Sequence, residues 1–428
     1  MTSLSESDLK NFHNALKDQP LEPSHPFYVC PFDNTSDTVM ELARSIEWRD
    51  DASMNLVSGQ RGSGKSTELR RLRQMLEQSG CCVFLCDMSG FINFDYPVEI
   101  TDFLVSVLLA FSEAVREKYQ DNPLDRPILQ RVSQFLHAHI KITGINVGEE
   151  NSSFFGLALK QDPDVKQKLQ DALRSKLTLI LQELSEFIEE VIELITHKNS
   201  GKSQKIVLLL DSIEQIRGKS DNAHQVHESV AILFTHHIEK LRLPKIHTVY
   251  TIPPYLPSLA GSTGDSSIYH FPNIHALHRS GELDENGVRI MEEILSKRFV
   301  NWESIVTAQQ LRKQIIPATG GNLREFFRLL TVILRKINLK QLPVSDKIIH
   351  AAKNNLRADM LPIPLDEQDW LRRIAENKEA NLPDNSKILT LARFLDNNLV
   401  QHHRNDSEWY DINPLLKDVI LPSASTSV

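Results

Sequence analysis

The stretch that decides the fold is Gly59-Gln60-Arg61-Gly62-Ser63-Gly64-Lys65-Ser66. It carries glycine, lysine and serine at every fixed position of the phosphate-binding pattern G-x-x-x-x-G-K-[ST]. Glycine lets the backbone N–H groups of such a loop converge on phosphate oxygens, and a following helix directs its positive end at the same anion. We therefore predict that Gly59 to Thr67 binds a nucleoside triphosphate. Lys65 would reach the β- and γ-phosphates, and the Ser66 hydroxyl would ligate Mg²⁺.

The sequence on both sides of this loop fits the strand and the helix that the chemistry requires. Met54 to Ser58 is a short apolar run that predicts a buried strand. After the loop, Leu69, Leu72 and Leu76 recur at helical spacing. The alternative is a chance match in a surface loop, which the flanking strand and helix disfavour.

A second apolar strand ends in an acid. Lys205 to Asp211 reads Lys-Ile-Val-Leu-Leu-Leu-Asp, which is typical of a strand buried on both faces of a parallel sheet. Ligands bind beyond the carboxyl ends of such strands, so we predict that Asp211 holds Mg²⁺. We also favour Glu214 as the base that polarises the attacking water, the alternative being an acid that only solvates a helix start. Thr251 ends a later predicted strand, where a γ-phosphate contact and a purely β-forming role are equal alternatives.

These two motifs occur with a third, Thr319-Gly320-Gly321-Asn322-Leu323-Arg324-Glu325. Together they resemble the AAA+ and STAND ATPases, particularly the origin-recognition-type and NACHT-like branches, over about residues 25 to 350. The resemblance implies that the third segment opens a lid helix and that Arg324 contacts the γ-phosphate, which a guanidinium recognises by charge and fork geometry. It further implies ATP and Mg²⁺ as ligands, a homo-oligomer, a separate effector protein and a role in bacterial anti-phage defence.

The sequence departs from this pattern at one position. AAA+ proteins place a glutamate directly after the aspartate of the second motif, whereas Ser212 stands there and the acid follows two residues later, as in STAND proteins. This predicts an ATPase with slow hydrolysis and leaves open a nucleotide-binding scaffold with little turnover. Arg279, Arg289 and Arg298 are candidates for contacting the nucleotide of a neighbouring subunit.

The order of these motifs predicts an α/β fold, namely a parallel P-loop NTPase sheet with a helical insertion. The resemblance implies that a helical lid follows it. Two predicted helices over 367–377 and 387–397 and a predicted hairpin over 399–412 resemble a winged-helix domain after the lid. The predicted boundaries are 1–24 for a polar N-terminal segment, 25–280 for the ATPase core, 281–355 for the lid and 356–428 for the winged-helix-like domain. Further core elements are expected at 37–48, 81–86, 99–118 and 268–277. Pro272 lies inside the last of these runs and marks it as an edge strand.

The insertion spans about residues 120 to 204. Asp162-Pro163 is a favourable helix start, and apolar residues recur at helical spacing from Val165 to Ile195. They predict one helix of about 35 residues, about 50 Å long, or two helices broken near the middle. We favour packing of this stripe on the core or on a helix over 127–140, rather than a partner-docking arm. Residues 144–156 are expected to form a loop.

Composition limits the partners. The chain has 428 residues, a formal net charge of −8 and no run of eighteen apolar residues, which predicts a cytoplasmic protein with no membrane span. Residues 288–360 alone hold thirteen Lys and Arg against six Asp and Glu, a net +7. Two interpretations of this basic region are open: solvated lid helices, or a surface that binds nucleotide, a neighbouring subunit or nucleic acid. The second helix of the winged-helix-like part has only Lys387 and Arg393, so we favour protein contact over DNA, leaving a DNA-binding origin-recognition-type ATPase as the alternative.

Cysteine and histidine give no metal-ligand pattern. Cys81, Cys82 and Cys86 lie in one apolar run and are expected to be buried thiols, as is common for free cysteine. The pairs His236-His237 and His402-His403 are adjacent, and neighbouring side chains on a helix or strand diverge. We therefore expect neither pair to bind a metal.

Overall fold

The computed structural model describes residues 4–32, 37–119, 167–168, 170–171, 173–219, 221–259, 266–383, 387–404 and 407–421. The chain divides into two compact units. The sheet unit comprises Thr38–Ser58 and Glu68–His270, and the lid unit comprises Met1–Asp37, Gly59–Thr67 and Phe271–Val428. The phosphate-loop sequence therefore belongs to the lid unit, although it directly follows a strand of the sheet unit.

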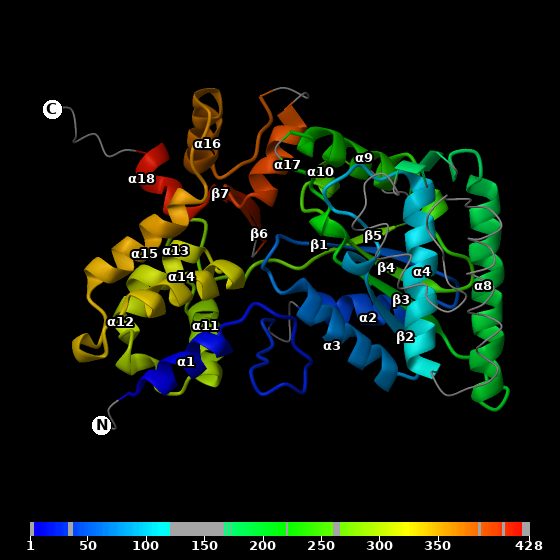
Figure 1. Ribbon diagram of the computed structural model, residues 1–428, viewed down its shortest axis with the longest axis horizontal. Coiled ribbons are helices and arrows are strands. Elements are labelled where there is room, and N and C mark those ends of the chain that lie inside the picture. Colours follow the sequence, from blue (N-terminus) through cyan, green and yellow to red (C-terminus); the bar gives the residue numbers. More distant parts are fainter. Residues whose placement is uncertain are drawn as a thin grey trace. The chain divides into compact units, whose positions relative to one another are not determined.

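The sheet unit is built on five parallel strands in the order β2-β3-β4-β1-β5 (Figure 1). Their bounds are β1 (Met54–Ser58), β2 (Cys82–Asp87), β3 (Ile206–Asp211), β4 (His247–Ile252) and β5 (Ser267–His270). Every residue of β1, β3 and β4 is buried, which explains the continuous apolar run of β3. Because the strands are parallel, Ser58, Asp211 and Ile252 end at the same edge of the sheet. The predicted α/β fold of a P-loop NTPase is confirmed.

The last core strand is shorter than predicted. It was expected over 268–277, but β5 ends at His270, and Leu277 forms only an isolated bridge to Leu283. Pro272 follows the strand and has no N–H to donate to a ladder, so the pairing cannot continue. The predicted edge position is confirmed, since β5 pairs only with β1.

Helices cover this sheet in layers. They are α2 (Thr38–Trp48), α4 (Ile100–Tyr119), α8 (Leu177–Lys198), α9 (Ala223–Thr235) and α10 (Leu256–Leu259), with short 3-10 turns η1 (Met88–Gly90), η2 (Ile213–Gln215) and η3 (Ile238–Leu241); α3 (Lys65–Gln78) begins in the phosphate loop. The ring of Phe111 on α4 contacts two other rings. Its centroid lies 5.1 Å from that of Phe84 on β2 and 5.4 Å from that of Phe187 on α8. Figure 1 shows α8 running beside α4.

The insertion follows the two-helix alternative where it is described. The chain turns at Arg174 and Ser175, after helical residues, and α8 begins at Leu177. The apolar side of α8, from Ile180 to Ile195, is buried, so intramolecular packing is confirmed for this helix. The predicted helix start at Asp162, the helix over 127–140 and the loop over 144–156 lie outside the described residues.

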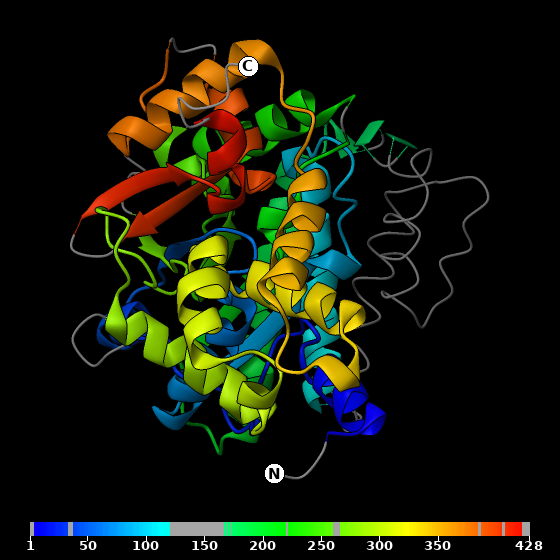
Figure 2. The same ribbon diagram turned by 90° about the vertical axis from the view of Figure 1, so that its left-hand side faces the viewer.

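The lid unit is a helical bundle with its own apolar core (Figure 2). Its helices are α1 (Glu6–Ala15), α11 (Glu285–Arg298), α12 (Ala308–Gln310), α13 (Ile316–Thr319), α14 (Leu323–Lys336) and α15 (Asp346–Ala358), with the π-helix η5 (Leu311–Ile315) and the 3-10 turns η4 (Trp302–Ser304) and η6 (Leu339–Gln341). The N-terminal segment was expected to be a polar lead-in, but α1 packs on α14, and Phe12 stacks on Phe299 at 4.7 Å. A capping box of Ser5 and Asp8 starts this helix.

The C-terminal part of the lid unit has the predicted order of two helices and a hairpin. The elements are α16 (Leu365–Asn377), α17 (Ile388–Asp396), β6 (Val400–Arg404), β7 (Glu408–Ile412), η8 (Pro414–Leu416) and α18 (Lys417–Ile420). The winged-helix identity of this part stays a prediction. His402 stacks on Tyr410 and His403 on Trp409, so the two histidines point to opposite faces of the hairpin, as expected.

The other sequence expectations can be checked over the described ranges. Cys81, Cys82 and Cys86 are buried, and no cluster of metal-ligating side chains occurs among the described residues. Within those residues, no helix combines the length and apolar character needed to cross a membrane.

Candidate nucleotide-binding site

The phosphate loop is closed on itself by its lysine. Lys65 is 3% exposed, and its Nζ donates to the carbonyl oxygens of Gly59 at 2.8 Å and Gln60 at 3.0 Å. Ser63 N–H donates to Gln60 O at 3.2 Å, which completes a tight turn before α3 begins at Lys65. The loop thus places a buried ammonium and a helix N-terminus at one point, as anion binding requires.

Two glycines of the loop have no room for a side chain. A Cβ on Gly59 would lie 2.3 Å from the Phe271 carbonyl oxygen. Gly62 has φ +86°, and a Cβ there would lie 2.5 Å from Cβ of Arg324 and 2.6 Å from Oδ1 of Asn322. The glycines therefore admit close neighbours as well as a ligand, and one of those neighbours is the predicted phosphate-sensing arginine.

The segment before α14 is built around Asn322. Its Oδ1 accepts from Glu325 N at 3.1 Å and caps α14, so this segment opens a helix as predicted. Its Nδ2 donates to Arg61 O at 2.9 Å, and the neighbouring Leu323 N–H donates to Gly62 O at 3.2 Å. The start of the lid helix is thus hydrogen-bonded to the backbone of the phosphate loop.

Gln60 ties the same loop to the C-terminal hairpin. It is 3% exposed, and its Nε2 donates to Val400 O of β6 at 2.8 Å. Its Oε1 accepts from His402 N at 3.0 Å and from Asn273 Nδ2 at 3.1 Å. Asn273 Oδ1 in turn accepts from Asn322 Nδ2 at 3.0 Å. Three buried amide side chains therefore connect the loop, the lid-helix cap and the hairpin.

The loop and the lid arginine fit an anionic group. Ser63 Oγ and Arg324 Nη1 are buried and have no hydrogen-bond partner in the described chain, although both residues adjoin the loop glycines. A buried donor without an acceptor is costly, by about 1–3 kcal/mol. Phosphate oxygens would supply the missing acceptors. The donors present are a backbone turn, an ammonium and a guanidinium, which are typical phosphate ligands.

The predicted acidic residues belong to the sheet unit and follow β3. Asp211 is 4% exposed, and its Oδ1 accepts from Ser212 N at 2.7 Å. Ser212 adopts φ 71°, ψ 4°, a left-handed conformation that is unfavourable for serine and that turns the chain sharply into η2. Glu214 lies in η2 and is half-buried. The extra turn at Ser212 is the structural counterpart of the displaced acid in the sequence.

Thr251 supports this turn. Its side chain is fully buried, its Oγ1 accepts from Ile213 N at 3.0 Å, and it donates to Leu210 O at 3.3 Å. The hydroxyl therefore connects β4 to the chain on both sides of Asp211. A direct phosphate contact of Thr251 stays a prediction, and the geometry shows a supporting role in the turn.

The predicted site residues form two groups, one in each unit. Lys65, Ser66 and Arg324 adjoin the phosphate loop in the lid unit, whereas Asp211, Glu214 and Thr251 form the β3–β4 group in the sheet unit. Joint action of the two groups on one nucleotide remains a proposal.

The three arginines that were candidates for contacting a neighbouring subunit differ in how far their side chains are exposed. The guanidinium of Arg298 lies over the Phe327 ring at 4.4 Å and donates to Phe27 O at 3.3 Å, and burial lowers the pKa of Arg298 to about 10. This side chain is therefore packed within the lid unit, and its intersubunit role stays a prediction. Arg279 donates to Asn377 O at 3.1 Å, and Arg289 donates to Asn286 Oδ1 at 2.7 Å. Both of these side chains are more than 45% exposed.

No family model matches the sequence, and no curated protein matches it. Three solved structures are similar in fold. A Walker-type ATPase of Pyrococcus abyssi shares 15% identity over 95% of this chain and 99% of its own, with a TM-score of 0.43. The ORC2 protein of Aeropyrum pernix in ADPNP–ADP complexes shares 13% over 95% of each chain, TM-score 0.42. Cdc6p from Pyrobaculum aerophilum shares 11% over 95% and 96%, TM-score 0.39.

The bonding of three residues at the site escaped prediction. Gln60 was predicted to bind nucleotide as part of the loop, but its bonds to the hairpin were not, and Asn273 lies in a segment that was expected to be a strand. Asp18, which forms an ion pair with Arg324, lies in the supposed polar lead-in. No spacing rule links them, because Gln60 and its partners are 213 to 342 positions apart. The spacing of Leu9, Phe12 and Leu16 was the available signal that the N-terminal segment is folded.

Proposed function

We propose that this chain is an ATP-binding switch of the AAA+/STAND type that hydrolyses ATP slowly and acts through conformation and assembly. ATP held by Gly59–Thr67 would change how the C-terminal hairpin is attached, and hydrolysis would reset it. The expected output is a homo-oligomer that regulates a separate effector protein in the cytoplasm. A place in bacterial anti-phage defence is part of this proposal and rests on the resemblance alone.

The observation that carries the proposal is the bonding of Gln60. All three hydrogen bonds observed for the side chain of this phosphate-loop residue go to the hairpin strand β6 and to Asn273, which adjoins the lid-helix cap. Gln401 of β6 also donates to Thr319 O at 3.0 Å, just before the lid helix. A phosphate that moves the loop backbone must strain or rearrange these buried bonds, since each has its partner fixed by packing.

The chemistry is assigned residue by residue. Lys65 would bind the β- and γ-phosphates, Ser66 and Asp211 would hold Mg²⁺, and Arg324 would contact the γ-phosphate. Mg²⁺ would neutralise charge that develops on the phosphates during transfer to water. Glu214 would accept the proton of that water. Slow turnover is expected because the acid stands two positions later in the sequence than the glutamate of ordinary AAA+ proteins.

Hydrogen exchange of the hairpin tests the coupling. In the wild type, ATP with Mg²⁺ is expected to change amide exchange over Val400–Arg404, and Gln60→Ala is expected to bind ATP while losing most of this change. Gln314→Ala removes a half-buried glutamine that donates to Asp346 and serves as the matched control. Absence of ATP binding would end the proposal. An equal exchange response in wild type and Gln60→Ala would remove the coupling route.

A second candidate function is DNA binding by an origin-recognition-type ATPase. It is favoured by Arg335, Lys336, Lys340 and Lys347, which are exposed and have no acidic partner among the described residues. Replacing Lys336, Lys340 and Lys347 together by Ala is expected to abolish a steeply salt-dependent affinity for duplex DNA if this function is present. No binding by the wild type at low salt would exclude it.

A third reading is a nucleotide-binding scaffold with little hydrolysis, which Ser212 motivates. Equal and negligible ATP turnover by wild type and Glu214→Gln, with intact ATP binding, would establish it.

A further inference from the structure

The chain between α1 and residue 22 runs along the site and contacts it at two points. Residues 16–21 are named the strap. Asp18 forms an ion pair with Nε of Arg324 at the start of α14. Three residues later, Leu21 N–H donates to Thr67 Oγ1 in the first turn of α3 at 3.2 Å. The strap therefore connects the predicted γ-phosphate sensor with the last residue of the phosphate loop.

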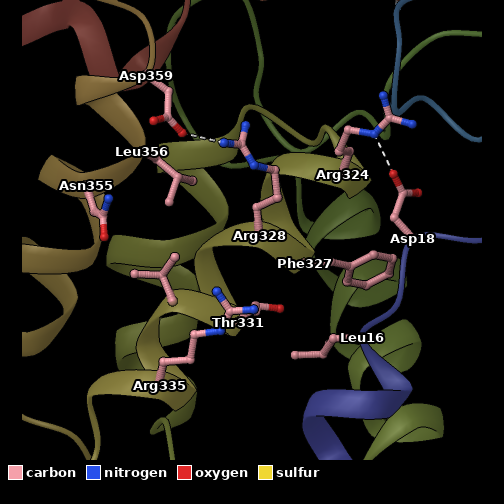
Figure 3. A pocket seen from close by; sticks show the side chains of 11 residues that line it. Leu16, Asp18, Arg324, Phe327, Arg328, Thr331, Arg335, Asn355, Leu356 and Asp359 are labelled. Carbon is pink, nitrogen blue, oxygen red and sulfur yellow. Dashed lines mark hydrogen bonds and ion pairs between the residues drawn. The ribbon is translucent and has the colours of Figure 1, made fainter.

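The strap also forms one wall of a pocket of about 470 Å³ whose other walls are α14 and α15. Figure 3 shows Asp18 facing Arg324, while the guanidinium of Arg324 points away from the other lining side chains. This direction is informative because Cβ of Arg324 adjoins Gly62 of the phosphate loop. Arg324 therefore lies at the rim of the pocket, and its terminal nitrogens point away from the pocket.

Within the part of the chain that the structure describes, Arg324 is hydrogen-bonded at one edge of its guanidinium. A guanidinium presents one edge at Nε and another between its two terminal nitrogens, and either can hold an oxyanion. Asp18 binds Nε, whereas Nη1 is buried without a hydrogen-bond partner. The bond to Asp18 fixes the side chain, and Nη1 on the second edge remains an unsatisfied donor.

Arg328, one turn later on α14, shows the contrasting arrangement. Its Nη1 donates to Glu325 at 2.9 Å, and its Nη2 donates to Asp359 at 2.6 Å. Both terminal nitrogens of Arg328 are thus bonded to carboxylates of α14 and of the C-cap residue of α15, so Arg328 ties these two helices together. Arg324 is instead bonded through its Nε to Asp18 of the strap.

We propose that Asp18 is a positioning residue that holds Arg324 by its Nε edge and thereby presents the Nη edge to a γ-phosphate in the phosphate loop. This inference rests on the proposed function, because it presupposes ATP at the loop. A charge-assisted bond to Nε removes rotamer freedom that Arg324 would otherwise lose on binding the phosphate. ADP has no γ-phosphate, so Asp18 determines the preference for ATP over ADP and not nucleotide affinity in general.

Calorimetric titration of the full chain with ADP and with a non-hydrolysable ATP analogue tests this assignment. Asp18→Ala is expected to weaken the ATP analogue about 10-fold and ADP less than twofold, a difference that is typical of one charge-assisted contact. Asp18→Glu should restore most of the preference. Asp359→Asn, which removes the partner of Arg328 on the opposite wall, should leave both affinities unchanged. In a double-mutant cycle, Asp18→Ala should add nothing to Arg324→Ala.

The outcomes separate the two proposals. An unchanged ATP-to-ADP ratio in Asp18→Ala, with both nucleotides bound, overturns only the positioning role. A tighter ATP complex in that variant also overturns it, since Asp18 would then repel or compete with the phosphate. Failure of the wild type to bind either nucleotide overturns the proposed function and this inference together.

Discussion

The phosphate loop and the acidic turn after β3 are the two halves of the predicted chemistry, and they are built differently. The loop satisfies its pattern at every fixed position and is supported by buried amides of Gln60, Asn273 and Asn322. The acidic turn departs from the AAA+ pattern at Ser212, which adopts a left-handed conformation. The predicted phosphate-binding loop is thus complete, whereas the predicted catalytic base is displaced from its AAA+ position.

This difference favours nucleotide binding over rapid hydrolysis as the main property of the chain. Binding needs donors and a helix N-terminus, and the loop supplies both. Hydrolysis needs a base aligned with water to within about an ångström, and misplacement by that amount costs about 100-fold in rate. A chain with a complete binding loop and a displaced base is suited to slow switching between nucleotide states.

The largest expected effect comes from removing the base. Glu214→Gln should lower ATP turnover about 1,000-fold while leaving ATP affinity within a factor of two, because general-base catalysis contributes on this scale. Phosphate release under single-turnover conditions measures it. Glu228→Gln, an exposed acid of the same unit, is the control. Wild-type turnover in Glu214→Gln would show that another group activates the water.

The loop lysine should affect binding instead. Lys65→Ala is expected to weaken ATP about 100-fold, since a buried ammonium that contacts two phosphates is worth about 3 kcal/mol. Titration calorimetry measures the change, with Lys340→Ala as an exposed lysine control. If Lys65→Ala bound ATP as tightly as wild type, the phosphate-loop assignment would be wrong.

The sequence predicted the elements of both halves from continuous local signals. β3 is apolar at five successive positions, and Asn322 caps α14 where the Gly-Asn-Leu-Arg segment suggested. It did not predict the bonding of Gln60, because a loop glutamine carries no information about a hairpin about 340 residues later. The N-terminal helix α1 was overlooked because its polar face dominates the composition, although Phe12 and Leu16 join the lid core.

The hairpin that bonds Gln60 should also respond to pH. Burial lowers the pKa of His403 to about 3, with smaller contributions from His402, His275, Lys378 and Lys417. The unfolded chain takes up a proton near pH 6.5 and the folded chain does not, so stability falls as the pH falls from 6.5 toward 3. At pH 5 this loss is about 2 kcal/mol.

Denaturant unfolding at pH 7.5 and pH 5 measures this pH dependence. His403→Phe keeps a ring stacked on Trp409 but cannot titrate, so its stability should fall about 2 kcal/mol less than that of wild type. His350→Phe, an exposed histidine on α15, is the control. An identical pH dependence in wild type and His403→Phe would refute the buried neutral state of His403.

The smallest expected effect comes from replacing Ser212 in the turn that follows β3. Ser212→Gly should raise the free energy of unfolding by about 1 kcal/mol, because glycine adopts the left-handed conformation without strain. Ser89→Gly, at a position without a positive φ, should not stabilise the protein. Thermal unfolding of both variants measures the difference, and destabilisation by Ser212→Gly would mean that the serine side chain itself supports the turn.

Particle mass in sedimentation tests most directly whether the bound nucleotide acts through conformation and assembly. Wild type and Glu214→Gln are expected to sediment as a larger species with ATP and Mg²⁺ than with ADP or no nucleotide, whereas Lys65→Ala should stay at one mass throughout. One unchanged mass for wild type in all three conditions, combined with rapid ATP turnover, would contradict a switch and indicate an ordinary ATPase.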